Sequence, residues 1–230
     1  MVKKINIEGF ECWGALCAGA NRIDYLIYPA LVPMEEKWLE ERSMKLKANL
    51  VMVYVPAEDW NNVLTPWPEP GETKNSEPFG GKSQDFLKFL ESKIIPGVEK
   101  AFGLLNVSER DLTGVSLGGL FTLWTWVKGD FFNNIACLSG SFWYPGFLDW
   151  FETNLPKKKT GRCYFLLGEQ EPHSHIKEFR SVGQNTEQIV KSLKEIGCEV
   201  TFDWVPGNHF SDPVHRLEQA LSGLYPSEYR

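Results

Sequence analysis

Residues 49–55, NLVMVYV, form a nearly continuous apolar run in which polar and apolar side chains do not alternate. A strand exposed on one face would alternate, so this run predicts a strand that is buried on both faces. Similar short runs follow at residues 111–115, 135–138, 162–167 and 199–205, and helix-like segments separate most of them. Strands that alternate with helices imply right-handed crossovers and a mostly parallel, doubly wound α/β sheet.

The N-terminal part of the chain has a different pattern. Three strand-like runs, KINIE, ECWGALCA and RIDYLIY (residues 22–28), follow one another closely, so we expect two or three of them to form an antiparallel meander. With these runs the sheet has about eight strands. A chain of 230 residues that is 43% hydrophobic suits one compact domain over residues 1–230.

The helical segments carry some signals of their own. Pro96 lies inside the helix expected over residues 83–102 and predicts that this helix is kinked or split. Asn185 precedes an amphipathic stretch that stops at Gly197, so we expect Asn185 to be the N-cap of that helix. A final amphipathic helix is predicted over residues 212–224.

The composition excludes several classes of function. The net charge is −6, the pI is about 5.4, and no long Lys/Arg block is present, which argues against nucleic-acid binding. No apolar run approaches the ~20 residues that span a bilayer. The five cysteines contain no CxxC pair and predict free thiols in a reducing compartment. We therefore expect a soluble, cytoplasmic protein that acts on a small molecule without a metal or other cofactor; no oligomeric state is predicted.

The segment at about residues 56–82 is long and rich in proline and glycine. Loops of this length are usually functional or disordered. The segment starts at the carboxyl end of a predicted strand and carries Trp60, Trp67 and Phe79, which favours a packed loop near a binding site. Disorder remains the alternative.

GVSLGG, residues 114–119, has the G-x-S-x-G pattern around Ser116. A strand-like run precedes it and a helix-like run follows, which is the context of a nucleophile elbow, a sharp strand-to-helix turn that exposes a reactive serine. Because the helix begins under the serine, the backbone N–H of Leu117 is expected to point at the oxyanion of a reacting carbonyl group. A plain glycine-rich turn with an exposed serine is the alternative.

A serine nucleophile needs a base and an acid that orients the base. His209 follows the last predicted strand, which is the place of the histidine in the chain order Ser, acid, His. Glu171 lies a few residues beyond the preceding strand and is the favoured acid; Glu169 is the alternate. A Ser–His dyad without an acid also stays open.

The remaining titratable candidates are weaker. His173 and His175 have the spacing of an H-x-H metal pair, but no third ligand is evident. His215 falls in the last predicted helix and is expected at the surface. Asp203 lies inside a predicted strand, and Asp212 is too close to His209 in sequence to act as its acid.

Five segments occur in order along the chain: LTPWP with FGGKSQDFLKFLESKIIPGVEKAFG, then GVSLGGLFTLW, CLSGSFWY, FLLGEQE and GNHF. Together they resemble the esterase D and enterochelin-esterase-like branch of the α/β-hydrolase superfamily. The elbow pattern alone is shared by many hydrolases, whereas the five segments in order are far more specific. The likeness extends from about Asn49 to Leu224.

The resemblance implies the α/β-hydrolase fold and a catalytic set made of Ser116 as nucleophile, His209 as general base and Glu171 as acid. It also implies a second oxyanion N–H from the turn after the third strand. Relatives usually have an Asp-Gly-Asn-like turn there, whereas this chain has YPA. Pro29 has no N–H, so Ala30 is the expected second donor.

The favoured function is a serine hydrolase that cleaves carboxylic esters through an acyl-enzyme. Trp67, Trp143 and Phe210 are expected to form apolar walls of the substrate pocket, although Trp143 also suits a core position. A thioesterase or acyltransferase on the same residues is one alternative, and a non-catalytic hydrolase fold that only binds a ligand is another.

Overall fold

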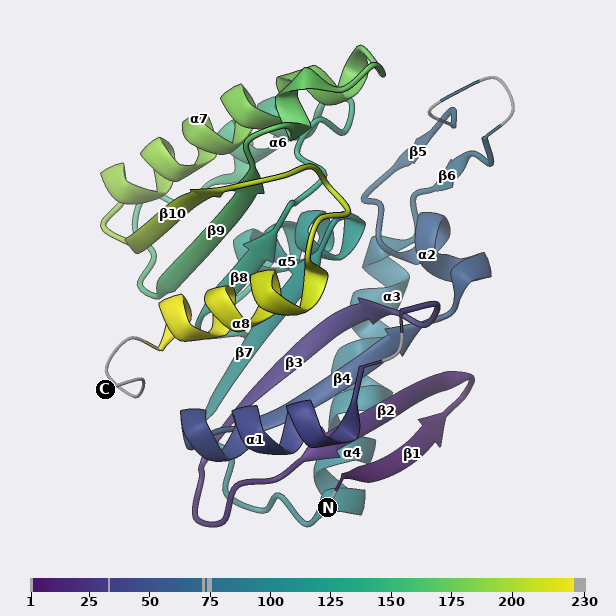
Figure 1. Ribbon diagram of the computed structural model, residues 1–230, viewed down its shortest axis with the longest axis vertical. Helices are drawn as coiled ribbons and strands as arrows, with labels where there is room; N and C mark the ends of the chain where they lie inside the picture. The colour runs from purple at the N-terminus through teal and green to yellow at the C-terminus, as the bar shows by residue number, and fades with distance from the viewer. Residues whose placement is uncertain (1, 33, 72, 74–75, 226–230) are drawn as a thin grey trace.

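The computed structural model describes residues 2–32, 34–71, 73 and 76–225. One sheet of eight strands crosses the molecule in the order β1-β2-β4-β3-β7-β8-β9-β10 (Figure 1). From β4 onward along this order all neighbours pair in parallel, while β1 and β2 are antiparallel. The strands are β1 Lys3–Ile7, β2 Phe10–Ala15, β3 Arg22–Pro29, β4 Asn49–Val55, β7 Glu109–Val115, β8 Ile135–Leu138, β9 Arg162–Gly168 and β10 Glu199–Val205.

The sheet confirms the predicted α/β architecture but corrects the extent of the N-terminal meander. β2 pairs with β4, and β3 pairs in parallel with β4 and β7 near the middle of the sheet. The run at residues 22–28 is therefore not the third strand of a meander. Its six central residues are all buried, which is the pattern of a central strand covered on both faces.

Helices cover both faces of the sheet, and strand alternation divides the core in two. In β4, Val51, Val53 and Val55 face one core cluster, and Leu50 and Met52 face the other. One face is covered by α1 (Glu36–Leu46) and α8 (Pro213–Leu224). The opposite face is covered by α3 (Ser83–Phe89), η1 (Leu90–Ile94), α4 (Ile95–Phe102), α5 (Leu117–Lys128), α6 (Phe147–Asn154) and α7 (Val182–Glu195).

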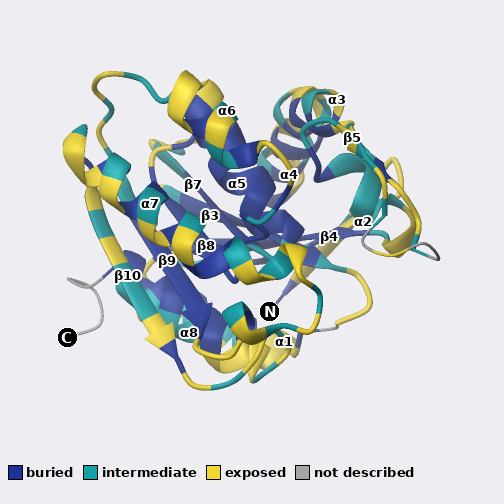
Figure 2. Cartoon of the chain, turned by 90° about the horizontal axis from the view of Figure 1, so that it is seen from above, coloured by how far each residue is buried: buried dark blue, intermediate teal, exposed yellow. Residues whose placement is uncertain are grey.

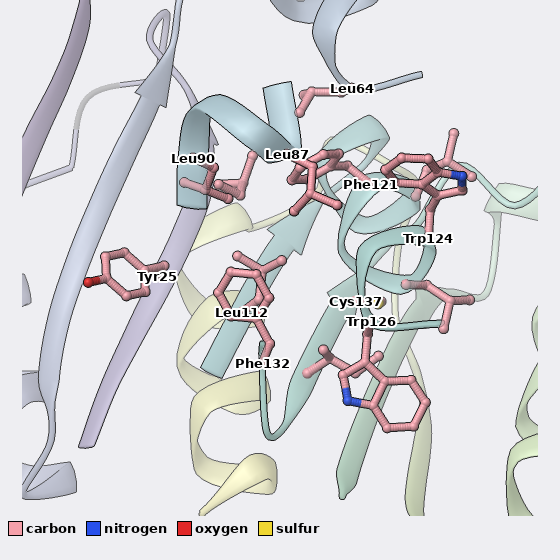
Figure 3. Close-up of a cluster of buried hydrophobic side chains, with 14 of the residues drawn as sticks. Tyr25, Leu64, Leu87, Leu90, Leu112, Phe121, Trp124, Trp126, Phe132 and Cys137 are labelled. Carbon is pink, nitrogen blue, oxygen red and sulfur yellow. The ribbon is translucent and has the colours of Figure 1, made fainter. Parts of the chain in front are cut away.

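Burial follows these layers. In the view from above, the central strands and α5 are buried, and the outer helices are exposed on their outward sides (Figure 2). Part of the larger core appears in Figure 3, where Phe121 and Trp124 of α5 lie with Leu87 of α3 and Leu90 of η1. α5 is buried from Leu117 to Val127, so the helix that begins at the elbow is held on all sides. A buried helix gives the serine that precedes it a fixed position.

The predicted break at Pro96 is confirmed. The helical segment consists of α3, one π-helical turn over Leu90–Ile94, and α4, which has Pro96 in its first turn. Proline has no backbone N–H to donate, so the regular bonding of the α-helix cannot continue through this position, and the wider turn accommodates the change.

The predicted N-cap at Asn185 is wrong. α7 already begins at Val182, directly after the 3₁₀ turn η3 (Glu178–Ser181), so Asn185 lies inside the helix. Its side-chain amide donates to the carbonyl oxygen of Phe142 at 2.7 Å. A tertiary hydrogen bond, rather than a cap, therefore explains the asparagine.

The described parts of the segment at residues 56–82 are structured rather than a plain loop. The segment contains α2 (Ala57–Val63) and a small hairpin of β5 (Pro68–Glu69) and β6 (Phe79–Gly80). Residues 72 and 74–75 lie outside the described residues. The N–H of Lys82 donates to the carbonyl oxygen of Asn62 at 2.8 Å, which closes the segment on itself.

None of the helices within the described residues has the length and apolar character that crossing a membrane requires.

Candidate active site

Ser116 lies on a sharp turn between β7 and α5, as the sequence predicts. Its backbone has φ 57° and ψ −121°, a region that residues other than glycine rarely adopt. A Cβ atom at position 114 would overlap the carbonyl oxygen of Gly118, so only glycine permits this crossing of strand and helix. The turn places Ser116 Oγ at the start of α5, above the carboxyl end of the sheet.

His209 lies in the loop after β10, and its Nε2 is 3.0 Å from Ser116 Oγ. Gly207 has φ 99° and permits the tight loop that turns the imidazole toward the serine. The carbonyl oxygen of Gly207 accepts a hydrogen bond from the N–H of Gln170 at 3.0 Å. This bond ties the histidine loop to the loop that follows β9.

Glu171 is the carboxylate that meets the histidine. It opens the short 3₁₀ turn η2 (Glu171–His173) after β9, and His209 Nδ1 donates to its Oε2 at 2.8 Å. Since a carboxylate only accepts hydrogen bonds, Nδ1 must carry the proton, which leaves Nε2 of the neutral ring to accept the Ser116 hydroxyl. The alternate acid, Glu169, is exposed. The structure therefore brings Ser116, His209 and Glu171 into one chain of hydrogen bonds.

The other oxygen of Glu171 has three buried partners. Its Oε1 accepts from Ser139 Oγ at 2.7 Å, from the N–H of Gly168 at 2.7 Å and from Arg216 at 3.2 Å. Arg216 extends from α8, is only 5% exposed and also donates to Ser139 Oγ at 3.0 Å. These contacts fix the carboxylate so that its second oxygen faces the imidazole.

The same contacts set the charge state of Glu171. Burial by itself raises the pKa of this carboxyl group, but hydrogen bonds from His209, Ser139 and Gly168 outweigh it, and the pKa is lowered. The carboxyl group of Glu171 therefore keeps its charge to a lower pH than a free glutamate does. Neither Ser139 nor Arg216 was predicted as a site residue from the sequence. For Arg216 a signal existed, because it is a charged residue on the apolar face of the last helix.

The remaining candidates have other surroundings. His173 and His175 line the cavity beside Ser116, and the described residues contain no group of three or more His, Cys, Asp and Glu side chains that could hold a metal. His215 is exposed on α8, as expected. Asp203 accepts a hydrogen bond from Tyr164, and Asp212 caps α8 by accepting from the N–H of His215.

The two expected oxyanion donors differ in availability. Leu117 is the first residue of α5, where an N–H has no partner within the helix. The prediction for Ala30 does not fit the structure. Its N–H donates to the carbonyl oxygen of Val55 at 3.0 Å, and Ala30 does not line the cavity beside Ser116. This bond lies at the end of the pairing of β3 with β4, so it holds the strand end in place.

A cavity of about 920 Å³ opens beside Ser116. Trp143 and Phe210 line it, as predicted, and Phe210 is 85% exposed at its rim. The prediction for Trp67 is wrong. Its indole N–H donates to the carbonyl oxygen of Pro145 at 3.0 Å, and its ring packs against Tyr144 and Trp150, so it supports the wall from behind.

Two further aromatic side chains complete the cavity and were not predicted as pocket residues. Trp60 of α2 lines one side. Phe179 of η3 packs against Trp143 with ring centroids 4.2 Å apart. The approach of these segments depends on how the loops after β4 and β9 fold over the sheet, and residue spacing does not report it.

The sequence model of the Putative esterase family matches residues 34–202, which is most of the chain and includes Ser116 and Glu171. The chain belongs to this family. Its match begins before β4 and ends within β10, so the shared region covers β4, β7, the elbow, β8 and β9, while β3 and His209 lie outside it.

Individual proteins that this chain resembles share less than a third of its residues. The protein YbbA of Bacillus subtilis (strain 168), described as uncharacterized, is 28% identical over 150 residues, which cover 64% of this chain and 60% of YbbA. An IroE-like serine hydrolase from Shewanella oneidensis superposes with a TM-score of 0.80 at 17% identity, covering 98% of this chain and 80% of the other.

A second solved structure, the siderophore hydrolase EstB from Aspergillus nidulans, has a TM-score of 0.74 at 16% identity and covers 98% of this chain and 95% of its own. At such identities the likeness shows the fold, which is that of the α/β-hydrolases.

Proposed function

We propose that this chain hydrolyses carboxylic esters through an acyl-enzyme formed on Ser116. The observation that carries the proposal is the continuous set of hydrogen bonds from Ser116 Oγ through His209 to Glu171, at 3.0 Å and 2.8 Å, at the edge of a cavity of about 920 Å³. Cavities of roughly 300–1,000 Å³ are typical of sites for small molecules. Membership of the esterase family supports the same reaction class.

The reaction proceeds in two halves. Ser116 Oγ attacks the carbonyl carbon while His209 Nε2 takes its proton, and the buried carboxylate of Glu171 stabilises the resulting imidazolium. The tetrahedral intermediate collapses as His209 gives the proton to the leaving alcohol. Water then attacks the acyl-enzyme with His209 as base, and Ser116 is released with its proton restored.

The cavity lining favours an uncharged, bulky ester. Among the described residues that line it there are four large aromatic side chains and no lysine or arginine. A thioester of coenzyme A carries phosphates, and the described lining offers no lysine or arginine to pair with them, so oxygen esters are favoured over that alternative. The four aromatic side chains are Trp60, Trp143, Phe179 and Phe210.

Hydrolysis of p-nitrophenyl and naphthyl esters by the purified chain tests the proposal, with a siderophore ester added to the panel because of the similarity to EstB. We expect the Ser116→Ala variant to keep the fold and lose turnover. Full turnover in that variant would contradict the proposal. Absence of turnover in the unaltered chain on every ester of the panel would favour the non-catalytic alternative.

We also propose a cytoplasmic location. All five cysteines have free thiols, and four of them are buried. Buried free thiols are typical of proteins from reducing compartments. Recovery of the protein from an oxidising compartment by cell fractionation would contradict this proposal.

A further inference from the structure

Ester hydrolysis needs donors that are already aimed at the place where the oxyanion forms, and one backbone N–H is usually not enough. The N–H of Leu117 supplies the first. In the turn after β3, Pro29 has no N–H, and the N–H groups of Ala30 and Val32 donate to Val55 and Pro29. Leu31 is 77% exposed and does not line the cavity. This turn therefore offers no donor to the site in the present arrangement.

Ser141 has a hydroxyl group in the required place. It lies in the turn after β8 and lines the cavity, and its Oγ is 3.4 Å from Ser116 Oγ. This distance is longer than a good O–H···O hydrogen bond of roughly 2.5–3.0 Å. The Ser141 hydroxyl is thus beside the nucleophile without being firmly bonded to it. An oxyanion attached to the same carbon as Ser116 Oγ would form in this neighbourhood.

The backbone of Ser141 is fixed against the elbow. Its N–H donates to the carbonyl oxygen of Ser116 at 3.1 Å, and its own carbonyl oxygen accepts from the N–H of Tyr144 at 3.0 Å. A Cβ at position 119 would lie 3.0 Å from Gly140 Cα, so the glycines let the turn pack directly on the start of α5. Ser141 itself is 1% exposed. A donor held in this way needs little reorganisation during the reaction.

We propose that the hydroxyl of Ser141 donates the second hydrogen bond to the oxyanion of the tetrahedral intermediate. This inference rests on the proposed esterase function. As the bond from Ser116 Oγ to the carbonyl carbon forms, the π electron pair moves onto the carbonyl oxygen and the serine proton moves to His209. The negative oxygen accepts from Leu117 N–H and Ser141 O–H. When the electron pair on the oxyanion re-forms the carbonyl double bond, the bond to the alcohol breaks and His209 protonates the leaving oxygen.

The Ser141→Ala variant tests the inference, since it removes the hydroxyl and keeps the backbone bonds. Loss of one oxyanion donor typically lowers kcat by roughly 10²–10³-fold. We expect a fall of about that size in kcat with KM within threefold of the unaltered chain. The Ser141→Thr variant, which retains a hydroxyl, should recover part of the loss. Ser92→Ala serves as the matched control, because Ser92 Oγ only donates to Lys88 within its own helical segment.

A transition-state analogue separates a catalytic role from a structural one. An aryl trifluoromethyl ketone forms a tetrahedral adduct with the serine, so its affinity should fall by the same factor as kcat/KM in the Ser141→Ala variant. Unchanged ketone affinity, or a kcat within threefold of the unaltered chain, would overturn the role of Ser141 and leave the esterase function standing. Lack of any hydrolysis by the unaltered chain would overturn both.

Discussion

Replacing Glu171 with glutamine should disable the histidine while leaving its position nearly unchanged. Oε1 of Glu171 faces three donors, from Ser139, Gly168 and Arg216, so the amide oxygen of glutamine must take that place. The amide NH₂ then faces His209 Nδ1, where Oε2 accepted at 2.8 Å. Nδ1 has to become the acceptor, and the ring proton moves to Nε2, which points at Ser116. His209 then cannot act as the base, although the side chains keep their positions.

The size of the effect follows from this change of tautomer. The equivalent change of acid to amide in a serine protease lowers kcat by about 10⁴-fold. This factor corresponds to about 5 kcal/mol of transition-state stabilisation. Arg216 also loses its buried counter-charge, which costs about 3 kcal/mol or more of unfolding free energy. For a chain of this size the midpoint of thermal unfolding should fall by roughly 6–12 °C.

The assay is the steady-state hydrolysis of a p-nitrophenyl ester at pH 8, at a temperature where circular dichroism shows that the variant is folded. Glu169→Gln is the matched control. It makes the same chemical change two residues away, at a side chain that is exposed. The control should retain full activity. A Glu171→Gln variant that is folded and keeps more than a tenth of the kcat would contradict the role of Glu171 and favour a Ser–His dyad.

Three further predictions follow from the surroundings of the site. Arg216→Met should lower the unfolding free energy, measured in urea, by about 1.5–3 kcal/mol. The loss is limited because Glu171 keeps its donors Ser139 and Gly168, and Arg216→Lys should recover part of it. An unchanged unfolding free energy would contradict the buried contact between Arg216 and Glu171. Gly114→Ala should lower the unfolding free energy by about 1–3 kcal/mol, because the added Cβ overlaps Gly118. The control Gly129→Ala, at a position with open space, should lower it less. Equal losses would contradict the tight crossing of strand and helix at Gly114. Because the pKa of Glu171 is lowered, its carboxylate adds stability that is complete above the unfolded-state value of about 4.3 and lost as pH falls through the folded value. The difference in unfolding free energy between the unaltered chain and Glu171→Gln should therefore shrink below about pH 4, and a difference independent of pH would contradict this.

Sequence reasoning succeeded where one residue type and one local pattern dictate the structure. The apolar runs at 49–55 and 162–167 predicted buried strands correctly, since runs this short and rich in β-branched or aromatic side chains suit a strand covered on both faces. The glycines around Ser116, between a strand-like and a helix-like run, predicted the elbow, and a Cβ at position 114 would overlap the backbone of Gly118. Chain order then placed Glu171 and His209 after β9 and β10, whose parallel pairing brings their carboxyl ends together.

The predictions were wrong where contacts between distant parts of the chain determine the surroundings of a residue. β3 was expected beside the first two strands, but a strand with six buried central residues gains more in the middle of the sheet. The N–H of Ala30 was expected to be free because the residue follows a strand, yet it donates to Val55 at the end of β4. Trp67 was expected in a pocket wall, but its ring packs against Tyr144 and Trp150. Each outcome depends on partners that lie far away in the sequence.

Covalent labelling of the folded chain with a fluorophosphonate, followed by peptide mass spectrometry, tests most directly whether Ser116 is the nucleophile. A serine activated by His209 and Glu171 should react once, at Ser116, and the Ser116→Ala and His209→Ala variants should not react. Labelling of a different residue, or no labelling of the folded chain, would contradict the claim that Ser116 is the nucleophile.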